Sequence, residues 1–235
     1  MQIFRNLEIT NIYSKDGYSE VSRAWNMSAW NRMEFDKATW MGLTTKQLLP
    51  DIYLIQEVVS KARPEIILET GTGRGGTTLL LASLLFFLEG KKLITIDLKI
   101  SDETRRGISR FPSLASMINF VEGSSIEQDT VARAKSLVDV GSHVLLIFDA
   151  GHTRHHVLQE LRMYSDLLQE GDYIIVCDTN MSYLSTTPRG VPQWTTNSPS
   201  NAIEEFLREN DNFEIDRSHE HWEITSFPDG ILRHK

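Results

Sequence analysis

Acidic residues follow several apolar runs of this chain, and they are the first candidates for chemistry. They are Glu69, Asp97, Glu122, Asp149 and Asp178. The runs are continuously apolar rather than alternating, which is typical of strands in a parallel sheet covered on both faces. In open sheets of this kind a ligand lies beyond the carboxyl ends of the strands, so we expect the binding site among these residues.

A glycine-rich turn follows Glu69. Residues 69–76 are Glu-Thr-Gly-Thr-Gly-Arg-Gly-Gly, and the apolar run from Thr77 to Leu88 predicts a helix directly after them. A strand, a glycine turn and a helix start together point free backbone N–H groups at a nucleotide-like ligand. The three glycines of the pattern GxGxxG are Gly71, Gly73 and Gly76. The turn by itself therefore fits either a nicotinamide dinucleotide or S-adenosylmethionine.

Glu69 favours S-adenosylmethionine, because a carboxylate before the turn would repel a pyrophosphate but can pair with an ammonium or sulfonium group. Asp97 lies about twenty residues after the turn, where a carboxylate accepts hydrogen bonds from ribose hydroxyls. Its alternative role is a helix cap or turn. Ser124 and Ser125 follow the third strand, where adenine or its ribose would lie, although an ordinary strand-to-helix turn explains them equally well. Arg74 either contacts a carboxylate of the cofactor or faces solvent.

Two carboxylates and an imidazole are expected at one mouth of the sheet. Asp149 and His152 follow one strand, and Asp178 follows the next strand in sequence order. Oxygen ligands of this kind suit a hard divalent cation such as Mg²⁺, which would hold a substrate hydroxyl and lower its pKa. His152 would then remove the proton. Alternatively, the two aspartates cap loops, and His152 is a surface histidine beside His155 and His156.

Apolar strands alternate with helices in the elements that must position these residues. Strands are expected at residues 65–69, 93–97, 118–122, 144–149 and 173–178, with two further strand-like runs at 213–217 and 221–226. Helices are expected from about residue 52 to Pro64, and at residues 76–89, 126–138, 154–168 and 201–210. The alternation predicts an α/β fold: a doubly wound, mostly parallel sheet with helices on both faces, Rossmann-like.

The composition argues against several classes of partner. With 235 residues, 40% of them hydrophobic, the chain can bury one sizeable core. A formal net charge of -8 disfavours nucleic acid and anionic membranes. The longest apolar run, Leu79 to Leu88, is too short to cross a bilayer. A single cysteine excludes an intramolecular disulfide, and no signal-peptide pattern opens the sequence, so we expect a cytoplasmic protein with a small-molecule substrate.

Residues 1–46 show no clean hydrophobic period but carry three tryptophans, Trp25, Trp30 and Trp40. We expect these residues to form an N-terminal arm that packs on the surface, either as a subunit interface in a homo-oligomer or as a lid.

A long loop is predicted between Asp178 and about Ser200, because this stretch is rich in Thr, Ser, Pro and Gly. A loop that leaves the carboxyl end of a strand is well placed to choose the substrate. Trp194, Tyr183 and Trp40 are candidates for the walls of an apolar pocket.

With these residues in view, the sequence resembles the cephalosporin hydroxylase and rhamnosyl O-methyltransferase family, a branch of the class I S-adenosylmethionine-dependent methyltransferases. The resemblance covers about residues 38–233. It rests on Trp40-Met41-Gly42, Gln56-Glu57, Glu69 to Gly76, Asp149 to His152, Asp178-Thr179-Asn180 and Phe213 to Arg217.

The resemblance implies a magnesium site and a catalytic base. In the better-studied members, an aspartate matching Asp149 and a Glu-Asp pair at the end of the next strand bind Mg²⁺. The histidine matching His152 is the proposed base that deprotonates a sugar hydroxyl. This chain has Cys177-Asp178 in place of the pair. Because a neutral thiol is a poor ligand for a hard cation, the metal site is expected to be weaker, unless Asn180 or a substrate oxygen fills the gap.

Together these features predict an S-adenosylmethionine-dependent O-methyltransferase domain at residues 47–235, acting on a hydroxyl of a small molecule such as a sugar or natural product. Catalysis is expected from His152, Asp149 and Asp178, with the two aspartates as metal ligands. Cofactor contacts are expected from Glu69, Thr70, Gly71, Gly73, Arg74, Gly75, Asp97, Ser124, Ser125 and Asp149. Two alternatives are a nicotinamide-dependent oxidoreductase, which the GxGxxG pattern allows, and a non-catalytic, cofactor-binding partner subunit, which Cys177 suggests.

Overall fold

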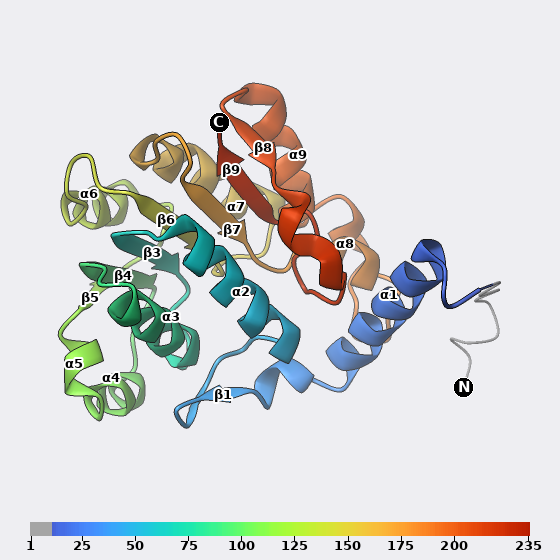
Figure 1. The fold of residues 1–235 in the computed structure, drawn as a ribbon, viewed down its shortest axis with the longest axis horizontal. Coiled ribbons are helices and arrows are strands. Elements are labelled where there is room, and N and C mark those ends of the chain that lie inside the picture. The colour runs from blue at the N-terminus through green and yellow to red at the C-terminus, as the bar shows by residue number, and fades with distance from the viewer. Residues whose placement is uncertain (1–10) are drawn as a thin grey trace.

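A seven-stranded sheet lies at the centre of the molecule (Figure 1). A computed structural model of the chain describes residues 11–235, apart from the side chains of residues 220–222. The strand order is β5-β4-β3-β6-β7-β9-β8, and neighbours are parallel except in the two pairs that include β9. The strands are β3 Ile66–Thr70, β4 Lys92–Asp97, β5 Ile118–Glu122, β6 Val144–Phe148, β7 Tyr173–Val176, β8 Phe213–Ile215 and β9 Ile231–His234. The predicted doubly wound, mostly parallel α/β fold is confirmed.

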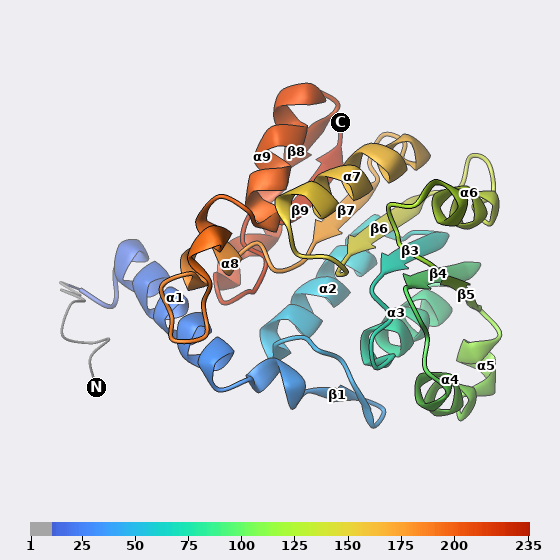
Figure 2. The same cartoon turned by 180° about the vertical axis from the view of Figure 1, so that it is seen from behind.

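Helices cover both faces of this sheet, which explains why its central strands are apolar throughout. Ile66 and Leu68 of β3 pack into one apolar cluster with α6, α7 and α9, whereas Ile67 packs into another with α2 and α3. Figure 1 shows the second layer in front, and Figure 2 shows the first. The helices are α2 Leu49–Ala62, α3 Gly76–Phe87, α4 Asp102–Ser109, α5 Pro112–Ala115, α6 Gln128–Ser136, α7 Arg154–Tyr164 and α9 Pro199–Glu209.

Two glycines of the turn between β3 and α3 allow close backbone approaches. Gly71 has a φ of +92°, and a Cβ atom there would lie 2.2 Å from the carbonyl oxygen of Asp149. A Cβ atom on Gly76 would lie 2.4 Å from the carbonyl oxygen of Thr44. The first glycine therefore lets the loops after β3 and β6 meet, and the second lets the N-terminal arm rest on the start of α3.

The N-terminal arm is more regular than the sequence suggests. Its described part contains the helix α1 Lys15–Asn31, a short 3-10 turn Glu34–Asp36, and a hairpin of β1 Thr39–Trp40 and β2 Leu43–Thr44. The residues that α1 buries are Gly17, Ser22, Asn26 and Ala29. These are small or polar, so the helix buries no apolar stripe, and its period is invisible to a hydrophobicity argument. The first ten residues of the arm lie outside the described residues.

Three local predictions fail. The run 221–226 is not a strand: it begins in the 3-10 helix Arg217–Trp222, and the strand beside β7 is β9. The interval 179–200 is not structureless, because it holds the short helix α8 Met181–Leu184 and the 3-10 helix η4 Pro192–Thr195. Helices α4 and α5, between β4 and β5, were not anticipated. Across the described residues, the structure contains no helix long and apolar enough to span a membrane.

Candidate active site

One cavity of about 800 Å³ opens above the carboxyl ends of β3, β4, β6 and β7. Its turn end is lined by Gly71 to Arg74, Asp97, Ser124 and Ser125, and its arm end by Asn26, Trp30, Phe35, Met181 and Trp194. Asp149, His152 and Asp178 also line it. Both ribbon views place α1 and α8 on the side of the molecule away from β4 and β5 (Figures 1 and 2). The cavity therefore lies where ligands bind in open α/β sheets and runs from the glycine turn toward the arm.

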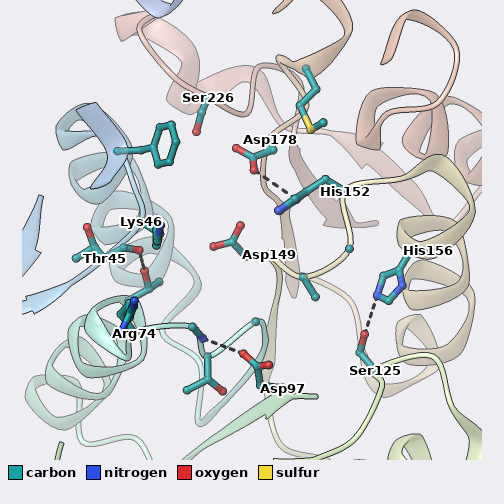
Figure 3. Close-up of a pocket in the computed structure, with 18 of the residues that line it drawn as sticks. Thr45, Lys46, Arg74, Asp97, Ser125, Asp149, His152, His156, Asp178 and Ser226 are labelled. Atoms are coloured by element: carbon teal, nitrogen blue, oxygen red, sulfur yellow. Dashed lines mark hydrogen bonds and ion pairs between the residues drawn. The ribbon is translucent and has the colours of Figure 1, made fainter. Parts of the chain in front are cut away.

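Asp97 is fastened to the glycine turn. Its Oδ2 accepts a hydrogen bond from the backbone N–H of Gly73 at 2.9 Å, which a dashed line at Asp97 marks in Figure 3. This contact fixes the direction of a carboxylate that has room for the hydroxyls of a ligand. Arg74 also lines the cavity, and its guanidinium forms an exposed ion pair with Glu103 at 3.4 Å.

Glu69 lies behind the cavity wall rather than in it. The side chain is fully buried, and its Oε2 accepts hydrogen bonds from Thr78 and Thr95 at 2.6 and 2.7 Å. Its Oε1 has no hydrogen-bond partner among the described residues. Burial raises the pKa of Glu69 to about 7, because the charged form loses its water. Thr70 and Gly75 are likewise outside the cavity lining of the described chain.

Asp149, His152 and Asp178 come together because β6 and β7 are paired in parallel. One potential ligand atom from each side chain lies within 4.8 Å of the others, and Nδ1 of His152 is 3.3 Å from Oδ2 of Asp178. Figure 3 shows the three side chains pointing into the same space. A fourth residue, Gln47 in the segment between the arm and α2, donates from Nε2 to Oδ2 of Asp149 at 2.8 Å. Sequence reasoning did not anticipate Gln47, because no motif or period includes it.

The two aspartates face each other at an electrostatic cost. Burial, followed by the negative charge of Asp178, raises the pKa of Asp149 well above its ordinary value. Asp178 also has a φ of +58°, in the left-handed region that aspartate tolerates better than most residues. Backbone strain and crowded like charges concentrate at functional sites, and a bound cation would relieve the second.

The donor set fits a divalent cation. Two carboxylates and an imidazole, completed by water, suit Mg²⁺ or a first-row divalent metal. Cys177 is not part of the set, because its side chain belongs to the apolar cluster that packs under α2 and α3. Burial raises the pKa of its thiol well above the ordinary value, so the thiol stays neutral.

Ser125, at the turn end of the cavity, is held by residues of α7. Its hydroxyl donates to Oε1 of the fully buried Glu160 at 2.6 Å and lies 2.9 Å from Nε2 of His156. The hydroxyl of Tyr164 donates to the backbone carbonyl of Ser125 at 2.8 Å. His156 lines the cavity as well. The i, i+4 spacing of His156 and Glu160 on α7 is the sequence signal that could have revealed this support.

The predicted aromatic wall is replaced by another. Trp194 lines the cavity, as expected, together with Trp30 and Phe35 of the arm. Trp40 instead packs against α3 and donates from Nε1 to Ser83 at 3.1 Å. Tyr183 lies outside the cavity lining of the described chain. The arm therefore contributes aromatic rings to the site, but not from the tryptophan that sequence reasoning chose.

This arrangement can hold a charged, ribose-bearing cofactor at one end and deprotonate a hydroxyl at the centre. Asp97 can accept hydrogen bonds from a diol, and the turn presents backbone N–H groups. At the centre, the imidazole of His152 can act as a base, and the neighbouring carboxylate of Asp178 can orient it. A neutral ring-bearing molecule fits the aromatic end.

Known proteins match both the sequence and the fold. Rhamnosyl O-methyltransferase of Mycobacterium tuberculosis (strain ATCC 25618 / H37Rv) is 26% identical over 226 residues, which cover 92% of this chain and 85% of that protein. A solved structure of CmcI D160 with Mg and S-adenosylmethionine has a TM-score of 0.62 at 18% identity, covering 88% of this chain and 84% of the other. An O-methyltransferase of Bacillus cereus in complex with S-adenosylhomocysteine has a TM-score of 0.54 at 16% identity, covering 86% and 84%.

The family comparison covers most of the cavity. Residues 33–235 match the family described as Rhamnosyl O-methyltransferase/CmcI. That range includes the glycine turn, the Asp149, His152 and Asp178 cluster, and Trp194. The chain therefore belongs to the rhamnosyl O-methyltransferase/CmcI family and is an S-adenosylmethionine-dependent O-methyltransferase.

Proposed function

We propose that this protein methylates a hydroxyl of a sugar or sugar-bearing natural product, with a divalent cation at Asp149 and Asp178 and with His152 as the base. One observation carries the proposal: the same cavity is lined by Asp97, which is hydrogen-bonded to the glycine turn, and by the cluster of Asp149, His152 and Asp178. A methyl donor held at the first and a hydroxyl held at the second would lie next to each other. Most of the catalytic effect would then come from positioning.

The turn end would hold the cofactor. Asp97 would accept hydrogen bonds from the ribose hydroxyls, because its carboxylate is fixed by Gly73 and faces the cavity. Ser124 and Ser125 would border the adenosine. Glu69 would act from behind the wall, where its ionised form would favour the positive ammonium or sulfonium group of the cofactor. Thr70 and Gly75 would shape the turn rather than touch the ligand.

The central cluster would activate the acceptor. Asp149 and Asp178 would hold a divalent cation, which would supply Lewis-acid stabilisation of negative charge on the acceptor oxygen. Magnesium is named in the CmcI structure with S-adenosylmethionine. His152 faces Asp178 through Nδ1, and a proton on Nδ1 leaves Nε2 as the base. The acceptor oxygen would attack the sulfonium methyl while Nε2 takes its proton, leaving a neutral thioether.

The sugar acceptor rests on two supports. The matched relatives are named rhamnosyl O-methyltransferases, and the arm end combines tryptophan rings with the amide of Asn26. A cytoplasmic location and a homo-oligomer remain predictions. The nicotinamide-dependent oxidoreductase is not favoured, since the family match points to methyl transfer.

Calorimetry and methyl transfer test this proposal. S-adenosylhomocysteine should bind, and a radiolabelled methyl group should pass from S-adenosylmethionine to methyl or aryl glycosides of 6-deoxyhexoses. Chelation of divalent metal should lower the rate, and added Mg²⁺ should restore it. A protein that binds S-adenosylhomocysteine but methylates only phenols would contradict the sugar acceptor. A rate indifferent to chelation would contradict the metal.

A further inference from the structure

The arm end of the cavity contains groups that the methyl-transfer chemistry does not use. Trp30 and Trp194 meet edge to face with ring centroids 5.7 Å apart, and Phe35 stacks on Trp30 at 5.2 Å. Arg189 holds Trp30 from the loop after α8: it donates to the backbone carbonyl of Trp30 at 2.7 Å, and its guanidinium lies 5.0 Å from the ring centroid. Trp30 is therefore fixed by three neighbours before any ligand arrives.

Asn26 adds a buried polar group on the same face of α1, one helical turn before Trp30. It is 2% exposed and lines the cavity. Its Nδ2 donates to the backbone carbonyl of Thr225 at 3.1 Å, which fixes the orientation of the amide. The amide also neighbours the hydroxyl of Tyr183. Its Oδ1 accepts no hydrogen bond within the described part of the chain, and Nε1 of Trp30 has no acceptor there either. An unpaired carbonyl and an unpaired N–H in one cavity indicate a ligand with its own hydroxyl groups.

A short series of contacts connects Asn26 to the central cluster. Thr225 precedes Ser226, which lines the cavity. The backbone N–H of Asn180 donates to the carbonyl of Ser226 at 3.1 Å, and Asn180 stands two residues after Asp178. The segment Thr225–Ser226 therefore contacts both Asn26, beside Trp30, and Asn180, beside the central cluster, so it would help to position a ligand relative to both.

From these observations we propose that Asn26, Trp30 and Trp194 form the acceptor subsite, in which the two tryptophan rings border a glycoside ring and Asn26 Oδ1 accepts a hydrogen bond from a hydroxyl other than the one methylated. The inference deepens the proposed function and rests on it. Tryptophan rings present a large apolar surface to the C–H groups of a sugar, and the two unpaired groups match a molecule with several hydroxyls. Asn26 and Trp30 precede the family-matched residues 33–235, so this subsite is partly built outside them.

The test uses the full chain loaded with S-adenosylhomocysteine, with methyl α-L-rhamnoside and p-nitrophenyl 6-deoxyhexosides as probes. Dissociation constants are measured by saturation-transfer NMR for the native protein and for Trp30→Ala, Trp194→Ala and Asn26→Ala. The matched control is Trp25→Ala, since Trp25 lies on the same helix but borders a different hollow, with Ala29 and Leu48. Affinity for S-adenosylhomocysteine, measured by calorimetry, reports on folding in every variant.

We expect Trp30→Ala and Trp194→Ala to weaken glycoside binding at least about tenfold, while Trp25→Ala changes nothing. Asn26→Ala should weaken the glycoside but not its analogue lacking the matching hydroxyl. If Trp30→Ala also loses S-adenosylhomocysteine, Trp30→Phe replaces it: the ring is kept, Nε1 is lost, and a smaller loss of glycoside affinity is expected.

Three results overturn the subsite. These are equal glycoside affinity in the native protein, Trp30→Ala and Trp194→Ala; an equal loss in Trp25→Ala; and no glycoside binding by the loaded native protein. Each can occur while S-adenosylhomocysteine still binds, and the proposed cofactor site then stands. Loss of S-adenosylhomocysteine binding in the native protein would instead contradict the proposed function itself.

Discussion

The turn end and the arm end of the cavity differ in how the chain builds them. The turn end includes one continuous segment, residues 71–74, with Asp97 fastened to it by a single hydrogen bond. The arm end collects side chains from α1, α8 and η4, which are far apart in the sequence. In a shared fold, the first kind of site is set by the backbone, while the second can change with each segment that contributes. The difference suggests a constant donor site next to an adaptable acceptor site.

The largest expected effect concerns His152, which lies between the two ends of the cavity. Replacing His152 by alanine should lower kcat about 10²- to 10⁴-fold, because the acceptor hydroxyl loses its base. Binding of S-adenosylhomocysteine should be unchanged, since His152 is not part of the turn end. Steady-state kinetics and calorimetry on the same preparation check both statements. Replacing His155, its neighbour in sequence, is the control; an equal loss there would remove the special role of His152.

The next effect concerns stability and pH. Glu69 behind the turn end is buried, with a pKa raised from 4.5 to about 7. Between these two pKa values the folded protein keeps a proton that the unfolded chain has released, so the contribution of Glu69 to the free energy of unfolding is greatest below pH 4.5 and is lost as the pH rises to about 7 and above. Glu69→Gln cannot titrate. Between acidic and slightly alkaline pH, native protein should lose up to roughly 3 kcal/mol relative to this variant, measured by urea unfolding.

Asp51 is a second buried carboxylate that can be compared with Glu69. Asp51, at the start of α2, accepts hydrogen bonds from the hydroxyl of Thr225 at 2.6 Å and from the backbone N–H of Ser226 at 3.0 Å. Burial raises its pKa from 3.8 to about 6, so the same reasoning places its effect at lower pH. Asp51→Asn should therefore flatten the more acidic part of the stability curve. Identical curves for both variants would show that neither carboxylate titrates as its burial implies.

Sequence reasoning reached the turn end more fully than the arm end. Residues 69–76 and the acidic strand ends are local patterns, and a parallel sheet brings them together by topology alone. The helix of the arm was not predicted because α1 buries residues such as Ser22 and Asn26 rather than an apolar stripe. The contact of Gln47 with Asp149 was not predicted because a single hydrogen bond between residues 102 positions apart produces no pattern in the sequence. Glu69 was found, but its burial behind Thr78 and Thr95 follows from packing and not from its place before the turn.

A smaller effect measures the turn end directly. Asp97→Ala removes the carboxylate that would accept the ribose hydroxyls and also frees the N–H of Gly73. Hydrogen bonds to charged groups contribute about 1.5–3 kcal/mol, so S-adenosylhomocysteine should bind roughly 10- to 100-fold more weakly. Calorimetry gives the constant. Glu103→Ala, beside the same turn at the surface, is the control, and equal affinity of Asp97→Ala and native protein would place the ribose elsewhere.

The smallest expected effect tests how Gln47, which directly follows the arm, supports the central cluster. Gln47 donates to Asp149 and favours its ionised form, against burial and the charge of Asp178. Without that donor, in Gln47→Ala, the pKa of Asp149 should rise further, so the acidic limb of the pH–rate profile should move to higher pH. Loss of one hydrogen bond of about 1 kcal/mol corresponds to a roughly three- to tenfold lower kcat near neutral pH. A positioning role predicts that raising the pH restores most of this rate, because Asp149 then ionises again. A uniform loss at every pH would mean that Gln47 only packs the segment before α2 against the sheet and does not tune the ionisation of Asp149.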